Sequence, residues 1–254
     1  MCLKLRYQEA RLWNQRAHQM VAGAVAAGIP TDPLLMAAPR LSEVVSVVDS
    51  VKKRHGPLIE DALIAAINGV QGWVAEKSKV PRLGKGYYKP DCIAVNQSTK
   101  TAYVFECKRN YGSLDAPAKR EADERLDEIG VLFPAYAASR GWPVMTPSLF
   151  ILSFYGTAPG SKHPVYDRNS ASALFPSCVV RFACDFISYT EEVVGTWAAE
   201  RAYNGDGSKH PELLPVRTAE TEVRKRGNIF YQLDQMECDA DATIEIGENG
   251  LTVI

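Results

Sequence analysis

Paired metal-ligand motifs are missing from this sequence. The chain of 254 residues contains six cysteines and four histidines, but it has no C-x-x-C pair and no H-E-x-x-H helix. These absences disfavour a zinc enzyme. We expect the cysteines to be reduced, mostly buried thiols.

Long apolar segments are missing as well. No stretch approaches the roughly 18 to 20 uncharged apolar residues that a membrane-spanning helix requires. The first 19 residues carry spaced charges in place of the apolar core of a signal peptide, namely Lys4, Arg6, Glu9, Arg11 and Arg16. We therefore expect a soluble, cytoplasmic protein without a membrane contact.

The composition indicates an ordinary globular protein. Hydrophobic residues make up 46% of the chain and charged residues 23%, which is enough apolar material for a buried core. The net charge of -1 gives no sign of a polyanionic partner, yet residues 77–89 carry five basic and no acidic side chains. This asymmetry could create a basic face. A solvated surface loop is the alternative interpretation.

Hydrophobic periodicity and turn residues predict an α/β chain. The central segments follow the order helix, three strands, helix, strand. The expected helices are Tyr7–Ala27, one beginning after Ser42, one beginning at Pro57, Ala116–Arg140 and, less regularly patterned, Glu191–Tyr203. The expected strands are Trp73–Lys79, Asp91–Asn96, Thr101–Lys108 and Ser148–Tyr155, with short ones near Ile229–Leu233 and Ala242–Ile246.

Two carboxylates converge if the second and third strands form a hairpin. A loop over Gln97–Lys100 pairs Asn96 with Thr101 and places Asp91 opposite Glu106. Directly opposed residues point to the same side of a sheet, about 5 Å apart. A loop with an odd number of residues would instead turn Glu106 to the other face.

The charges on this strand favour a divalent cation. Glu106 and Lys108 share one face of the strand, whereas Cys107 points to the other face with the core. Opposed carboxylates repel each other unless a cation lies between them, and hard oxygen ligands favour Mg²⁺, with Mn²⁺ as a substitute. Lys108 could then hold an attacking water. Solvated charges at strand ends are the alternative interpretation.

Pro90-Asp91 followed by Glu106-Cys107-Lys108 resembles the signature of the PD-(D/E)XK nuclease superfamily. The order of elements from Pro57 to Tyr155 resembles the restriction-endonuclease-like core of that family. The resemblance implies a metal-dependent endonuclease that acts on nucleic acid, with DNA favoured over RNA and a homodimer possible. It also implies an additional acid on the preceding helix, where Glu60 matches better than Asp61.

The resemblance covers about the middle hundred residues. No glutamine lies between Lys108 and Gln232, so the Gln-bearing helix of the RecB-like branch is missing. We expect an N-terminal helical cap (1–50), a nuclease-like catalytic core (51–156) and a C-terminal extension packed on the core (157–254). The flanking segments are expected to determine the choice of substrate.

A basic and aromatic loop leads directly into Asp91. Its charges and tyrosines are suited to phosphates and to stacking on bases, and the residues concerned are Lys85, Tyr87, Tyr88, Lys89 and, beyond the third strand, Arg109. Lys119, Arg120 and Arg125 could extend this track. On a helix they could equally pair with Glu121, Glu124 and Glu128.

Two other functions remain open at this point. One is a catalytically silent nuclease-like module that binds nucleic acid or a protein partner; the intact set of two acids and a lysine argues against it. The other is a metal-dependent phosphohydrolase that acts on a small nucleotide. The absence of a Gly-rich phosphate loop and of paired histidines disfavours the second.

Overall fold

The computed structural model describes residues 2–27, 39–82, 84–108, 114–143, 146–157, 159–201, 225–247 and 250–254. The chain divides into two compact units. The first unit consists of Met1–Lys4 and Glu60–Arg181, and the second of Leu5–Ile59 and Phe182–Ile254. These boundaries differ from residues 50 and 156, the expected segment boundaries, because α2 (Pro39–Asn68) and α4 (Ser177–Arg201) each contribute to both units.

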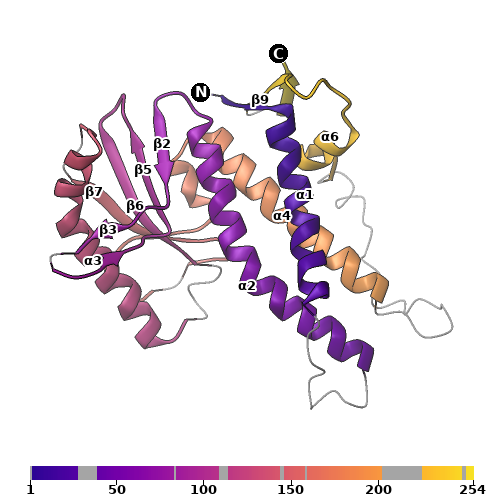
Figure 1. The fold of residues 1–254 in the computed structure, drawn as a ribbon, viewed down its shortest axis with the longest axis horizontal. Helices are drawn as coiled ribbons and strands as arrows, with labels where there is room; N and C mark the ends of the chain where they lie inside the picture. Colours follow the sequence, from indigo (N-terminus) through magenta and orange to yellow (C-terminus); the bar gives the residue numbers. More distant parts are fainter. Residues whose placement is uncertain are drawn as a thin grey trace. The chain divides into compact units, whose positions relative to one another are not determined.

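A five-stranded mixed sheet forms the first unit (Figure 1). β2 (Trp73–Glu76), β5 (Cys92–Asn96) and β6 (Thr101–Lys108) run antiparallel to one another, and β7 (Pro147–Ser153) and β8 (Val165–Tyr166) continue the sheet in parallel. α3 (Ala116–Ser139) connects β6 to β7. The expected α/β class and the expected order of these elements are confirmed, whereas β8 was not predicted.

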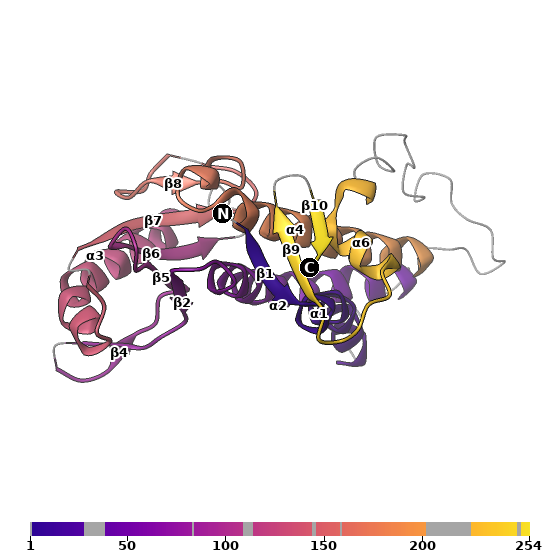
Figure 2. The same cartoon turned by 90° about the horizontal axis from the view of Figure 1, so that it is seen from above.

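The two faces of this sheet bury different side chains. α3 covers one face through Leu126, Ile129 and Phe133, which pack with Ile93 and Val104 of the strands (Figure 2). On the other face the buried rings of Phe105 and Phe150 stack with centroids 4.8 Å apart, and Trp73, Tyr103 and Phe175 contact this stack or one another. Both faces of β6 are therefore covered by the core.

The chain forms a small separate hairpin between β2 and β5 in the sequence. β3 (Val80–Pro81) pairs antiparallel with β4 (Tyr87–Tyr88), with Val80 opposite Tyr88. Val80 is fully buried and belongs to the same apolar cluster as the inner face of α3. The hairpin is therefore anchored to the core of the first unit by its first strand.

Helices predominate in the second unit. α1 (Tyr7–Ala26) confirms the first expected helix, and its Met20 and Val21 pack with Val47 and Val51 of α2. Trp13 makes edge contacts with Phe182 and Phe186 of α4. β1 (Leu3–Arg6), β9 (Thr243–Gly247) and β10 (Gly250–Val253) form a three-stranded sheet, in which β9 confirms the strand expected at 242–246.

Two predictions of secondary structure were wrong. The two helices expected after Ser42 and at Pro57 are one helix, α2, which contains both residues. Burial of Val51 and Ile59 on either side of Pro57 compensates for the backbone hydrogen bond that a proline removes. The strand expected near Ile229–Leu233 is a helix, α6 (Ile229–Gln235), because the Asn228 side chain caps it by accepting from the Phe230 N–H.

The helix expected around Glu191–Tyr203 is the second half of α4, which ends at Arg201. No helix in the described ranges combines the length and the apolar character needed to cross a bilayer.

Candidate functional site

The turn between β5 and β6 has the even length that the site requires. Asn96 pairs with Thr101, and four residues connect them. The Asn96 side chain accepts hydrogen bonds from the backbone N–H groups of Ser98 and Thr99, both at 3.0 Å. Lys100 completes the turn with a left-handed backbone, at φ 57°. The predicted pairing of these strands is confirmed.

This register brings Asp91 next to the Glu106-Cys107-Lys108 segment. Ile93 pairs with Val104 on the face of the sheet that α3 covers. Because side chains alternate between the two faces, Asp91 and Glu106, two residues further along their strands, lie on the same face. Asp91 Oδ2 accepts a hydrogen bond from the Cys107 N–H at 2.8 Å. Lys108 Nζ lies 3.7 Å from the same oxygen. Three of the predicted site residues are therefore gathered at the ends of two neighbouring strands.

Glu106 is the most buried charge in this group, with no exposed side-chain surface. Its Oε2 atom accepts hydrogen bonds from Lys108 Nζ at 2.9 Å and from Arg125 Nη1 at 3.0 Å. Its Oε1 atom is buried and has no hydrogen-bond partner among the described residues. A buried carboxylate oxygen without a donor is costly, so this atom is a natural ligand position for a cation.

The electrostatics at Glu106 depend on burial and on Asp91. Burial raises the pKa of Glu106, and the charge of Asp91 raises it further, while Lys108 and Arg125 act in the opposite direction. Burial lowers the pKa of Lys108, but the charges of Glu106 and Asp91 outweigh burial and raise that pKa overall. Lys108 therefore keeps its proton, and the charges of Lys108 and Arg125 do not fully offset the effects of burial and of Asp91 on the pKa of Glu106.

Glu60 lies on the last part of α2, which is fixed against β2. The Asn68 side chain donates to the Ala75 carbonyl and accepts from the Ala75 N–H, at 2.8 and 2.7 Å. Glu60 Oε2 is 2.9 Å from Lys77 Nζ, just beyond the end of β2. Burial and then the charge of Asp91 raise the pKa of Glu60. The third predicted acid therefore experiences the field of Asp91 and shares Lys77 with Asp61, which lies 2.6 Å from the amine.

Negative charge is in excess in two separate groups of ion pairs, one around Lys77 and one around Lys108 and Arg125. Three cations, Lys77, Lys108 and Arg125, contact five carboxylates. The five are Glu60, Asp61, Asp91, Glu106 and Glu121. In each group the carboxylates outnumber the cations by one.

Hard oxygen ligands of this kind suit Mg²⁺. Within the described residues, no three His, Cys, Asp or Glu side chains form a group that could hold a metal ion. Mg²⁺ usually keeps several waters and takes only one or two carboxylates. The carboxylates of Asp91 and Glu106 are donors of the kind and number that Mg²⁺ takes from a protein.

Two residues of this group were not predicted as site residues. Lys77 was noted only as part of a basic segment, and Arg125 only as a residue that could extend the basic track or pair along a helix. Arg125 does bind Glu121 at 2.9 Å, one helical turn away, and it also reaches Glu106. No sequence signal separates the two roles, since the second contact depends on how α3 packs on β6.

The basic and aromatic loop is the β3–β4 hairpin. Tyr87 is 51% exposed, and Lys79 Nζ lies 4.2 Å from the centroid of its ring. Lys85 and Lys89 are exposed and form no ion pair with any described carboxylate. Tyr88 is partly buried against the core. The hairpin therefore exposes Lys85, Lys89 and the ring of Tyr87 to solvent. Arg109, the remaining predicted contact for nucleic acid, lies outside the described residues.

The cysteines beside the site belong to the core. Cys92 and Cys107 are buried free thiols, and burial raises the pKa of each thiol well above its usual value. A thiol that holds its proton is a poor nucleophile and a poor metal ligand. The prediction that the two cysteines are buried thiols is confirmed.

Comparison with known proteins adds no relative to this picture. No protein-family model matches the chain, and neither the curated proteins nor the solved structures contain a significant match.

Proposed function

We propose that this chain is a Mg²⁺-dependent endonuclease of the PD-(D/E)XK, restriction-endonuclease-like type, outside the Gln-bearing RecB-like branch. It hydrolyses phosphodiester bonds, and DNA is favoured over RNA. Three antiparallel strands followed by a helix and a parallel strand support the fold assignment. The observation that carries the proposal is the Oε1 atom of Glu106, which is buried beside Asp91 and has no described hydrogen-bond donor.

Asp91 and Glu106 are the proposed metal ligands, and Glu60 is the proposed third acid. When bound, Mg²⁺ stabilises negative charge on a phosphoryl oxygen, and Mn²⁺ can replace it. Arg125 and Lys108 hold Glu106 by one oxygen, Oε2. The other oxygen therefore stays directed away from both cations, at a fixed position.

Lys108 acts as a cation during hydrolysis. In phosphodiester hydrolysis the oxygen of a water attacks phosphorus while the bond to the leaving sugar oxygen breaks; the water gives a proton to the solvent, and the leaving oxygen takes one from the solvent. Because the neighbouring carboxylates raise the pKa of Lys108, its ammonium group donates hydrogen bonds and does not accept the proton of the water. A positive charge at this place favours the deprotonated form of the attacking water and stabilises the charge that develops on the phosphoryl group.

The β3–β4 hairpin is the proposed contact for nucleic acid. Lys85 and Lys89 would bind phosphates, and the exposed ring of Tyr87 would stack on a base. Only Pro90 lies between Lys89 and Asp91. Substrate held by the hairpin is therefore close to the proposed metal ligands.

Cleavage assays test this proposal directly. The purified chain is incubated with plasmid, linear and single-stranded DNA and with RNA, in Mg²⁺ or in EDTA. We expect Mg²⁺-dependent cleavage of DNA by the wild type and its loss in Lys108→Ala and Glu106→Gln. Glu124→Gln, an exposed residue on α3, is the matched control and should cleave normally.

The same assays separate the alternative function. If the wild type binds DNA but cuts no polymer in Mg²⁺ or Mn²⁺, the chain is a nuclease-like binding module. If cleavage survives Lys108→Ala and Asp91→Ala, the site is elsewhere.

A further inference from the structure

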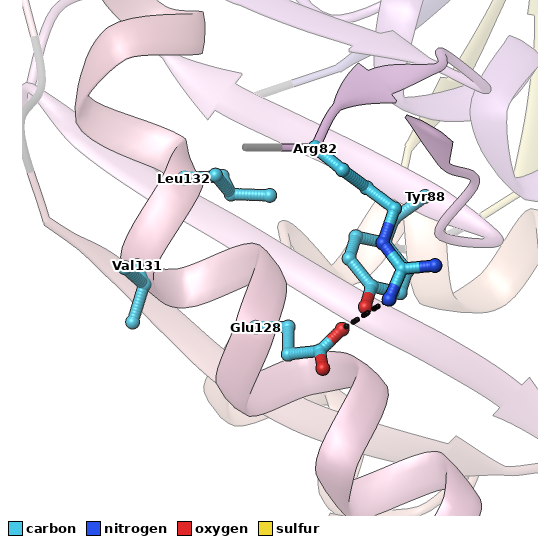
Figure 3. Close-up of a pocket in the computed structure, with 5 residues that line it drawn as sticks. All are labelled: Arg82, Tyr88, Glu128, Val131 and Leu132. Atoms are coloured by element: carbon cyan, nitrogen blue, oxygen red, sulfur yellow. Dashed lines mark ion pairs between the residues drawn. The ribbon is translucent and has the colours of Figure 1, made fainter. Parts of the chain in front are cut away.

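A pocket of about 260 Å³ lies between the β3–β4 hairpin and α3 (Figure 3). Leu132 points from α3 toward the hairpin, and Val131 stands beside it with 74% of its surface exposed. The guanidinium of Arg82 covers the Tyr88 ring at 4.2 Å and lies 3.6 Å from the Glu128 carboxylate. The pocket therefore combines an apolar wall with one cation and one anion.

The pocket is close to the proposed catalytic group. Glu128 is three residues after Arg125 on α3, a rise of about 4.5 Å on the same helix face. Tyr88 is three residues before Asp91, so their Cα atoms are at most about 11 Å apart. DNA advances about 3.4 Å per nucleotide along each strand. A nucleotide within about three positions of the cleaved phosphate can therefore reach the pocket.

The lining of the pocket is suited to a small planar ligand with a polar edge. Leu132 and Val131 can pack on the flat face of a ring, and the volume is below the roughly 300 to 1,000 Å³ of pockets for larger ligands. Glu128 accepts hydrogen bonds and Arg82 donates them. Stacking of Arg82 on Tyr88 fixes its guanidinium plane. A nucleobase has this combination of a flat apolar face and a mixed polar edge.

We propose that this pocket binds an unpaired guanine of the substrate, within about three nucleotides of the cleaved phosphate. This inference rests on the proposed function. Guanine presents two adjacent N–H donors, at N1 and N2, which match the two oxygens of Glu128, and its O6 accepts from Arg82. The base must be unpaired because this edge is occupied in a duplex. The site therefore gives the nuclease a preference at one position.

Mononucleotide binding tests the pocket without cleavage. The full chain is titrated with 5′-GMP, 5′-IMP and 5′-AMP while the methyl resonances of Val131 and Leu132 are followed by NMR. We expect 5′-GMP to shift both resonances. 5′-IMP, which lacks the N2 donors, should bind about tenfold more weakly because one charge-assisted hydrogen bond is lost. Glu128→Gln should weaken 5′-GMP binding by a similar factor, and Glu124→Gln should leave it unchanged.

The outcomes separate this inference from the proposed function. Equal affinity for the three nucleotides, 5′-GMP binding unchanged by Glu128→Gln, or no shift at Leu132 overturns the guanine pocket, even if the chain cleaves DNA. Selective 5′-GMP binding by a chain that cleaves no polymer supports the pocket and removes the nuclease assignment. Selective binding together with faster cleavage of guanine-containing single strands supports both.

Discussion

The carboxylate of Asp91 accepts a hydrogen bond from the backbone N–H of Cys107, the residue between Glu106 and Lys108. This bond ties the end of β5 to the segment of β6 that carries the other two functional groups. Asp91→Asn keeps an acceptor for the N–H but removes the charge. We expect cleavage to fall at least about 100-fold with a nearly unchanged free energy of unfolding, measured by urea titration.

Asp91→Ala is the matched comparison. It leaves the Cys107 N–H without its acceptor, so we expect an additional loss of about 1–3 kcal/mol in the free energy of unfolding. Normal cleavage by Asp91→Asn would show that cleavage does not need the negative charge of Asp91.

Arg125 holds Glu106 from α3, a contact between residues 19 positions apart. Arg125→Ala removes a positive charge that lowers the pKa of Glu106, so that pKa should rise further. We expect the acidic limb of the pH–activity profile to move to higher pH and activity at neutral pH to fall about tenfold.

Arg120→Ala is the control for this profile, because Arg120 is exposed on the same helix and has no contact with Glu106 among the described interactions. An unshifted profile in Arg125→Ala would contradict the positioning role of Arg125.

The buried Glu106 predicts a stability that depends on pH. Burial and then Asp91 raise its pKa above the ordinary value of 4.5, so the folded chain binds this proton more tightly than the unfolded chain. The contribution to stability is therefore full below about pH 4.5 and is lost as the pH rises through the raised pKa. Glu106→Gln imitates the protonated form.

We expect this variant to match the wild type near pH 4 and to exceed its free energy of unfolding at pH 7.5. Urea unfolding at both pH values measures the difference, with Glu124→Gln as control. A variant less stable than the wild type at pH 7.5 would show that the ion pairs of Glu106 outweigh its burial.

Lys100 is the one non-glycine residue with a left-handed backbone among the described residues. Lys100→Gly should increase the free energy of unfolding by about 0.5–1 kcal/mol, because glycine adopts this conformation without steric cost. Gln97→Gly, in the same turn but with an ordinary backbone, should decrease it. A lower thermal midpoint for Lys100→Gly would contradict this account of the turn.

The exposed face of the β3–β4 hairpin predicts how salt affects DNA binding. Lys85→Ala and Lys89→Ala should each reduce the slope of log K against log salt by about 1, because each removes one phosphate contact. Tyr87→Ala should weaken binding of single strands about tenfold without changing the slope. Fluorescence anisotropy at several salt concentrations measures both effects. Lys53→Ala on α2 is the control, and slopes equal to that of the wild type would remove the hairpin from the interface.

Local rules predicted much of the first unit. The alternation of β6 and the turn after Asn96 specify which side chains share a face, because both depend on residues within a few positions of one another. Long-range burial explains the errors. The apolar stripe on both sides of Pro57 keeps α2 continuous, which no local rule for proline indicates.

By itself the sequence determined that Glu106 and Lys108 share one face of a strand, and it placed Asp91 on that face only for a turn of even length, which the structure has. Only the tertiary structure decided which charges surround them. Lys77 approaches Glu60 because Asn68 fixes the end of α2 to β2, and Arg125 reaches Glu106 because α3 packs on β6. The physical reason is that strand pairing has a period of two residues, readable along the chain, whereas the packing of a helix on a sheet depends on the whole apolar face that it buries.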